Sequence, residues 1–238
     1  FPTDGDENPV GVEIQGRPVF GLRSEGGGVT TLDVRTESLT LDNAAAGLTA
    51  SDVVLASNGL LEVTAGSSIT AAVDSKYLAA TMSVSGDGTL LRVSADADAL
   101  TSRTDFTGAT TALMKIGESA EITGESVVLD STYGSKLASN LKLDADVLTL
   151  GSGQISVLLD GAPGTLAGSV ISPHLVLSGA TLADVFSSRE LTLRSYRSID
   201  IYGTGQIGSA DLGKLTLTGS GSELAHDRRV RDAYLGEG

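Results

Sequence analysis

The stretch LKLDADVLTLGSGQI (residues 141–155) shows the pattern on which most of the chain is built. Apolar and polar residues alternate over 141–145, the phase slips by one position at 147–148, and alternation resumes over 148–150. A period of two is typical of a strand with one buried face, and a phase slip without a loop indicates a bend. The glycines that follow allow a tight turn. We therefore predict two short strands with a corner between them, followed by a turn at Gly151 and Gly153.

The same Leu-x-Leu pattern recurs along the chain. Full versions occur at 39–41, 175–177, 191–193 and 215–217, and weaker versions at 61–63, 82–84 and 91–93. Leu39 and Leu61 are 22 residues apart, Leu61 and Met82 are 21 apart, and Leu191 and Leu215 are 24 apart. Repeats with a nearly constant period of this length are typical of solenoids.

The strands and their spacing predict an all-β fold, specifically a right-handed parallel β-helix (solenoid) with one short helix and inserted loops. Short strands at this period favour parallel stacking, because hairpins need tight turns between strands of matched length. The handedness follows from the general preference of parallel crossovers. We expect a disordered lead over residues 1–9, a β-helical rod segment over 10–222 and a charged tail over 223–238. The polar stretch 96–108 is expected to leave the stack, and 160–173 to form an inserted loop.

The short helix is predicted between residues 180 and 188, where the period of the pattern changes. Leu182, Val185 and Phe186 fall on one helical face, which is expected to pack on the rod. Thr181 is the expected N-cap residue, because its hydroxyl can accept a hydrogen bond from a free backbone N–H group.

Composition excludes several classes of protein. The 238-residue chain has a net charge of −14, which argues against binding nucleic acid or inserting into an anionic membrane through a basic surface. It has no cysteine, which excludes disulfides and thiolate metal sites. No apolar run approaches the length of a membrane-spanning helix. Because the chain begins at Phe1 rather than Met, we expect it to be part of a longer protein.

Two glycine-rich motifs resemble nucleotide-binding loops. The sequence GTGQIG (203–208) matches a dinucleotide fingerprint, and GSADLGK (208–214) matches most of a phosphate-binding loop. Both motifs need a helix that opens at the loop, and the next pattern is instead the strand 215–217. We predict turns at both motifs. The histidines, His174 and His226, are too isolated to suggest a triad or a metal site.

Two Asp-Ala-Asp sequences provide paired carboxylates, Asp96 with Asp98 and Asp144 with Asp146. On a strand, both members of a pair lie on one face, where they could bind Ca²⁺ or hydrolyse a glycosidic bond. An outward acidic face is more often simply solvated, and it also keeps strand edges apart. Since Leu143 and Ala145 are expected to face inward, Asp144 and Asp146 should face water. We predict no cofactor, with Ca²⁺ as the weaker alternative.

Three residues are candidates for ligand contact. Tyr196 and Tyr202 flank the predicted strand 198–202, and Arg197 lies between them. Exposed aromatic residues near arginine favour contact with a protein or a sugar. Packing in the core or at the edge of a solenoid is the alternative for both tyrosines.

The stretch LTLRSYRSIDIYGTG (191–205), with LVLSGATL (175–182) before it and GSADL (208–212) after it, resembles the filamentous haemagglutinin family. More narrowly, it is similar to the large exoproteins of proteobacteria, over roughly residues 141–217. The resemblance implies a right-handed β-helical rod that is secreted through an outer-membrane transporter of the two-partner type. It also implies a non-enzymatic adhesin or a stalk that displays other domains. The family's Asn-Pro-rich secretion motifs and an Arg-Gly-Asp triplet are absent from the sequence.

The predicted function is a structural or adhesive rod segment of a secreted bacterial surface protein, without enzymatic activity. The expected partners are the transporter and a glycan or protein receptor on a host or bacterial surface, and no nucleic acid. The alternative functions are a β-helical polysaccharide lyase or hydrolase, and a glycan-binding module without turnover.

Overall fold

The computed structural model describes residues 12–15, 19–25, 29–72, 81–162 and 174–219. The chain in these ranges is all-β, apart from one short helix. The elements are β1 (Val12–Gln15), β2 (Val19–Glu25), β3 (Val29–Thr36), β4 (Ser38–Leu41), β5 (Leu48–Ala50), β6 (Asp52–Ser57), β7 (Leu60–Val63), β8 (Ser68–Ala71), β9 (Thr81–Ser85), β10 (Thr89–Ser94), β11 (Leu100–Thr104), β12 (Leu113–Ile116), β13 (Glu121–Ser131), β14 (Gly134–Leu137), β15 (Lys142–Leu158), β16 (Leu175–Ser178), α2 (Gly179–Phe186), β17 (Glu190–Tyr202) and β18 (Lys214–Thr218). The predicted lead (1–9), the predicted tail (223–238) and residues 163–173 of the predicted loop lie outside the described residues.

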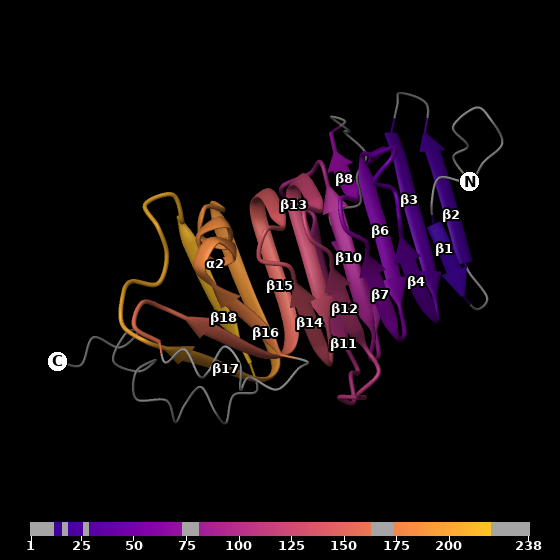
Figure 1. Cartoon of the computed structure of the whole chain (residues 1–238). Coiled ribbons are helices and arrows are strands. Elements are labelled where there is room, and N and C mark those ends of the chain that lie inside the picture. Colours follow the sequence, from indigo (N-terminus) through magenta and orange to yellow (C-terminus); the bar gives the residue numbers. More distant parts are fainter. Residues whose placement is uncertain (1–11, 16–18, 26–28, 73–80, 163–173, 220–238) are drawn as a thin grey trace.

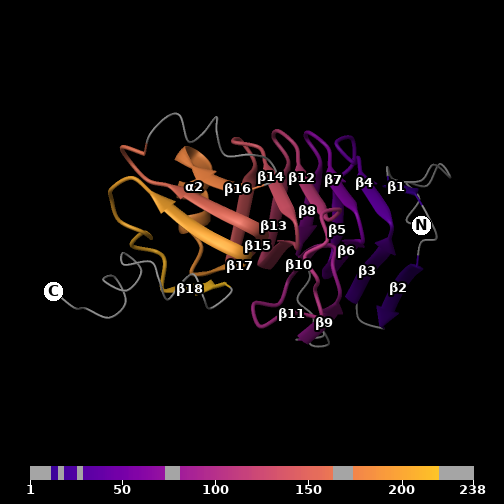
Figure 2. The ribbon, with the colours of Figure 1, turned by 90° about the horizontal axis from the view of Figure 1, so that it is seen from below.

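Two sheets form the body of the molecule. One has five strands in the order β1-β4-β7-β12-β14, and the other has eleven, with the main order β18-β17-β15-β13-β10-β6-β3-β2. Figures 1 and 2 show the strands of each sheet following one another along the long direction of the molecule. A continuous set of buried apolar side chains from both sheets forms one core between them. Strands such as β4, β7 and β12 bury alternate residues, as the period of two predicted, whereas β10 buries every residue.

Two of the three spacings noted in the sequence join residues that are paired on neighbouring strands. Leu39 of β4 is paired in register with Leu61 of β7, and Leu191 of β17 with Leu215 of β18. The pairing of Leu61 with Met82 was wrong, because Leu61 is instead paired with Met114 of β12. Met82 lies in β9, which forms a separate parallel pair with β11. The excursion predicted over 96–108 contains β11, and its departure from the two main sheets is confirmed.

Most strand pairs are parallel, but β10 is an exception within the large sheet. It lies between β6 and β13 and runs antiparallel to both. The chain reaches β10 from β9 through a turn in which Gly86 has a φ of 84° and Gly88 a φ of 156°. This left-handed backbone favours glycine and reverses the direction of the chain. A purely parallel arrangement was therefore wrong for β10, and the pairs β1–β4 and β2–β3 are also antiparallel.

The stretch 141–155 differs from the prediction in an important respect. Residues 142–158 form one strand of 17 residues, β15, rather than two strands and a turn. Gly151 and Gly153 lie inside this strand, where they allow close approach of neighbouring groups. A Cβ atom on Gly153 would lie 2.1 Å from the backbone oxygen of Tyr133. The predicted turn was wrong because glycine serves close packing here rather than chain reversal.

The predicted helix is present as α2, and it packs against β15 and β16. Leu182, Val185 and Phe186 are buried in the main core, which confirms the predicted helical face. The predicted cap was wrong: Ser178 occupies the N-cap position, and its side chain makes no capping hydrogen bond. Thr181 is buried within the first turn, where its hydroxyl donates to the backbone oxygen of Ser139 at 3.4 Å. No helix among the described residues is long and apolar enough to span a membrane.

Candidate functional site

The outer strand pair β9–β11 covers part of the large sheet and creates a second buried layer. Val54, Leu90 and Val128 face away from the main core, on β6, β10 and β13, and they are 4%, 1% and 3% exposed. Met82 and Val84 of β9 pack against them. The three central strands are therefore buried on both faces. Continuous apolar runs such as 53–55 and 127–129 are the sequence signal for this kind of burial.

A buried ion pair lies in this second layer. Arg92 of β10 donates from Nε and Nη2 to the two carboxylate oxygens of Asp52 at 3.1 and 3.0 Å, and from Nη1 to the backbone oxygen of Leu100 at 3.0 Å. Burial raises the pKa of Asp52 above its usual range, and the hydrogen bond and charge of Arg92 oppose this effect. Because Leu100 belongs to β11, Arg92 links the main sheet to the outer strands.

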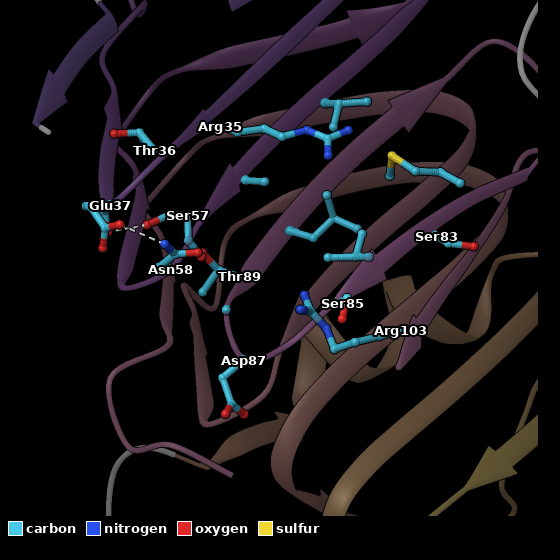
Figure 3. A pocket seen from close by; sticks show the side chains of 16 residues that line it. Arg35, Thr36, Glu37, Ser57, Asn58, Ser83, Ser85, Asp87, Thr89 and Arg103 are labelled. Atoms are coloured by element: carbon cyan, nitrogen blue, oxygen red, sulfur yellow. Dashed lines mark hydrogen bonds between the residues drawn. The ribbon is translucent and has the colours of Figure 1, made fainter. Parts of the chain in front are cut away.

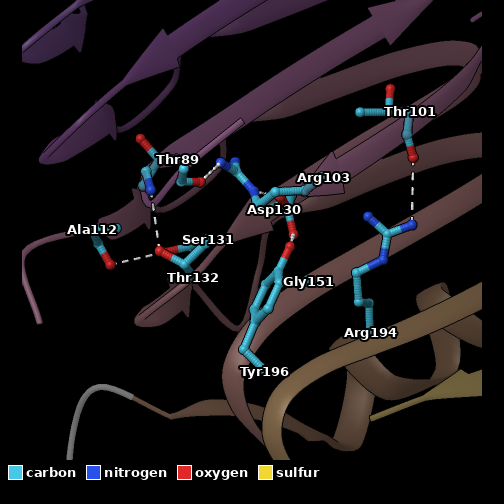
Figure 4. A network of polar contacts seen from close by, with 12 residues as sticks. Thr89, Thr101, Arg103, Ala112, Asp130, Ser131, Thr132, Gly151, Arg194 and Tyr196 are labelled. Carbon is cyan, nitrogen blue, oxygen red and sulfur yellow. Dashed lines mark hydrogen bonds and ion pairs between the residues drawn. The ribbon is translucent and has the colours of Figure 1, made fainter. Parts of the chain in front are cut away.

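A second charged cluster ties β11 to β13 and β17 (Figure 4). Nε of Arg103 lies 2.8 Å from Oδ2 of Asp130, and the side chains are 2% and 1% exposed. Tyr196 of β17 donates its hydroxyl to Oδ1 of the same carboxylate at 2.7 Å. Nη1 of Arg103 donates to the backbone oxygen of Gly86 at 2.8 Å. The carboxylate of Asp130 therefore holds together three segments that are far apart in the sequence.

Gly151 makes room for this cluster. It is paired in register with Asp130 on one side and with Arg194 on the other. A Cβ atom at Gly151 would lie 1.9 Å from Oδ1 of Asp130. The Asp130 carboxylate thus crosses β15 only because this position has no side chain.

An open groove lies beside β9, on the outer face of β3, β6 and β10 (Figure 3). Its volume is about 730 Å³. The polar side chains around it include Arg35, Glu37, Asn58, Ser83 and Arg103. Apolar side chains of the second layer complete its lining. We call this feature the β9 groove; its size falls within the range of about 300–1,000 Å³ that is common for ligand sites.

Asp87, at one end of the β9 groove, organises the loop after β11. Its carboxylate accepts hydrogen bonds from the backbone N–H groups of Thr107 at 3.0 Å and Gly108 at 2.9 Å, and from the hydroxyl of Thr107. Burial alone would raise the pKa of Asp87, but these hydrogen bonds, with one from the backbone of Ala109, outweigh it and lower the pKa to about 2. The carboxylate is therefore engaged in loop structure.

The three predicted contact residues occupy different environments. Tyr196 is half-buried, with its hydroxyl on Asp130 and its ring at 4.7 Å from that of Phe106, in an edge-to-face arrangement. Burial, followed by the charge and hydrogen bond of Asp130, raises the pKa of Tyr196. Arg197 is exposed, and its guanidinium carbon lies 5.7 Å from the centre of the Tyr133 ring. Tyr202 is half-buried at the end of β17, where burial and then Asp200 raise its pKa. Tyr196 and Arg197 are thus adjacent, and Tyr202 lies further along the strand.

The acidic pairs have separate outcomes. Asp144 and Asp146 are exposed while Leu143 and Ala145 pack against the core, which confirms the predicted faces. The prediction for Asp96 and Asp98 was wrong, because these residues lie in a turn rather than on a strand.

In that turn, Asp96 accepts a hydrogen bond at 2.9 Å from the backbone N–H of Asp98. Among the described residues, no group of three or more His, Asp or Glu side chains is arranged to hold a metal ion.

The glycine-rich motifs form turns, as predicted. Residues 203–213 contain bends but no helix, and β18 follows them directly. Gly203, Gly205 and Gly208 have positive φ angles of 93°, 142° and 104°. His174 is half-buried before β16, and burial lowers its pKa. His226 lies outside the described residues.

Comparison of the chain with protein-family models, with curated proteins and with solved structures found no match. The fold and the geometry of the second layer therefore carry the functional argument.

Proposed function

We propose that this chain is a segment of a right-handed parallel β-helix, and that it forms part of the rod of a secreted bacterial surface exoprotein of the filamentous haemagglutinin type. In this proposal the rod mediates cell adhesion or displays domains that do so, and it has no enzymatic activity. The parent protein would reach the surface through an outer-membrane transporter. Its receptor would be a glycan or a protein on a host or bacterial surface.

The observation that carries the proposal is the in-register stacking of aliphatic residues. Leu41, Val63, Ile116 and Leu137 occupy equivalent positions on β4, β7, β12 and β14, which pair in parallel. A second column runs through β13, β15, β17 and β18 at Leu129, Leu150, Leu193 and Leu217. Burial of apolar surface stabilises such columns by about 25 cal/mol per Å².

Stacked repeats suit a rod because each unit packs mainly on its neighbours, so length can increase without a larger core. The resemblance of residues 191–205 to the exoprotein family supports the same class of protein. The absence of cysteine means that such a rod depends on packing and strand pairing rather than on disulfides.

Antibodies raised against the purified chain test the proposed location on the producing bacterium. The proposal expects labelling of intact cells, and it expects bound antibody to reduce attachment of these cells to host cells or to one another. Labelling only after permeabilisation would overturn the surface location. Labelling of intact cells without any effect of the antibody on attachment would leave display as the role of this segment.

A glycan-binding module, or a polysaccharide lyase or hydrolase, is the second candidate, and the β9 groove is the observation in its favour. Its lining includes the acidic residues Glu37 and Asp87, and the carboxylate of Asp87 holds the loop after β11. Incubation with acidic and neutral polysaccharides, followed by measurement of new reducing ends, distinguishes the alternatives. New reducing ends that Glu37→Gln abolishes would favour an enzyme, and glycan-array binding without cleavage would favour a binding module.

A further inference from the structure

The outer strand pair leaves one edge of β9 without a partner strand among the described residues. The N–H of Gly86 donates to the backbone oxygen of Thr104 at 2.9 Å, so the backbone groups of Gly86 point toward β11. Backbone groups alternate in direction along a strand, so those of Val84 and Met82 also point toward β11. The N–H and C=O groups of Ser83 and Ser85 must then point to the other edge, where both residues line the β9 groove.

The two edges of the outer pair are treated differently. On the far edge of β11, Nη2 of Arg194 donates to the backbone oxygen of Thr101 at 3.4 Å (Figure 4). Charged side chains, prolines and bulges are the usual means of protecting a sheet edge. The sequence of β9, TMSVS, contains no charge and no proline. The edge of β9 is therefore suited to pairing with another strand.

The floor beside this edge suits a strand with alternating side chains. Ala56 is the partly exposed apolar residue beneath the edge, and the nearly covered side chains of Val54 and Leu90 lie beside it in the β9 groove. In an added strand, every second side chain would contact this apolar floor, and the others would face solvent. Arg103 supplies a further donor: its side chain is 2% exposed, it lines the groove, and its Nη2 has no hydrogen-bond partner within the described ranges (Figure 3).

We propose that the β9 groove binds an extended peptide segment of another protein, which adds a third strand to the β9–β11 pair. The backbone groups of Ser83 and Ser85 would pair with the peptide backbone, and an oxygen of the peptide would accept a hydrogen bond from Arg103. The peptide carries no net negative charge, because the chain has a net charge of −14 and the arginines in the groove, Arg35 and Arg103, are already paired with Asp33 and Asp130. Backbone pairing gives affinity in this mode of recognition, and the floor selects small or apolar side chains at alternate positions.

Peptides selected from a random display library on the immobilised chain are the probe. Synthetic versions are added to the ¹⁵N-labelled chain, and amide hydrogen exchange is followed by NMR. Binding is expected to slow exchange at Ser83 and Ser85 and to leave Met82 and Val84, which already face β11, nearly unchanged. This alternation is specific to strand addition, and a sugar or an irregular ligand would not produce it.

Three variants accompany the measurement. Ser83→Pro removes a backbone donor from the open edge and is expected to weaken binding about tenfold or more, whereas Ser83→Ala keeps the N–H and is expected to stay within about twofold. Ala56→Phe fills the floor of the β9 groove and is expected to abolish binding, so the proposal stays testable if the proline variant does not fold. Melting curves establish which variants are folded.

Several outcomes would overturn the proposal. The library could yield strongly acidic peptides, or binding could protect amides outside β9. The folded variants Ser83→Pro or Ala56→Phe could bind as well as the wild type. The chain could also bind oligosaccharides but no peptide. Each of these outcomes is independent of cell-surface labelling, so failure here leaves the proposed rod function intact.

Discussion

Replacing Gly151 with alanine should destabilise the protein, although glycine inside a strand is normally unfavourable. At a site without steric conflict, alanine would stabilise the fold by about 0.4–1 kcal/mol, because it restricts the unfolded chain. Here the added Cβ would lie 1.9 Å from Oδ1 of Asp130, a distance that no relaxed structure tolerates. The carboxylate would have to move, although Arg103 and Tyr196 both hold it in place.

The expected cost follows from what Asp130 would lose. Breaking a buried ion pair by removing one partner typically costs about 3–5 kcal/mol, since the other charge remains buried without compensation. Subtracting the gain from alanine leaves a net destabilisation of about 2–4.6 kcal/mol. Urea denaturation, with equal m-values for both proteins, provides the measurement. Gly213→Ala is the matched control, because the nearest atom to its Cβ would be the oxygen of Arg189 at 3.4 Å, an ordinary contact.

A double-mutant cycle isolates the role of the carboxylate. In an Asp130→Ala background the contact with Oδ1 is absent and the backbone Cα of residue 130, at 3.2 Å, remains the near neighbour, so Gly151→Ala should be close to neutral. A similar loss of stability in both backgrounds would show that the conflict lies with the backbone rather than with the Asp130 side chain. A stabilising effect of Gly151→Ala in the wild-type background would contradict the close approach altogether.

Three further predictions concern packing, the second buried layer and the loop at Asp87. Leu143→Asp should lower the thermal midpoint, because it places a charge against the core, whereas Asp144→Ser should change stability by no more than about 0.5 kcal/mol; equal losses would contradict the assigned faces. Asp52→Ala should cost about 3–5 kcal/mol in denaturant unfolding because the buried guanidinium of Arg92 loses the carboxylate that balances its charge, and the double variant with Arg92→Leu should recover much of that loss; no recovery would argue against the pair. Because the folded pKa of Asp87 lies below its unfolded value, its contribution to stability should be fully present above about pH 4 and lost as the pH falls toward 2; NMR titration should give a midpoint near 2, and a midpoint near 4 would contradict the hydrogen-bonded loop.

Local pattern was enough to predict which residues face inward over much of the chain. The clearest case is residues 143–146, where Leu143 and Ala145 face the core and Asp144 and Asp146 face solvent. Alternation in the sequence directly indicates which side of such a strand is buried. The buried face of α2 was predictable in the same way, because apolar residues three and four positions apart lie on one side of a helix. The spacing of 22 residues from Leu39 to its in-register partner shows that repeat length also carries information on pairing.

The candidate site was predictable only in part. Tyr196 was singled out from its sequence, but its hydrogen-bond partner Asp130 is 66 residues away. Arg103 carries no local sign of burial, since a charged residue next to polar neighbours is usually solvated. Asp52 borders the apolar run 53–55, but its partner Arg92 is 40 residues away. The continuous apolar runs at 53–55 and 127–129 were the available signal that a second layer covers the sheet, and they indicate burial without identifying what covers it.

The amino-acid pattern thus fixes strands, their buried faces and an all-β class, because burial of alternate side chains is a local property of an extended chain. The direction of β10, the position of β9–β11 over the sheet and the purpose of Gly151 depend on contacts between segments far apart in sequence. Glycine is compatible with both a turn and a crowded strand, so composition alone could not separate them. Only the folded arrangement places the carboxylate of Asp130 over Gly151 and leaves one edge of β9 without a partner strand in the described part of the chain.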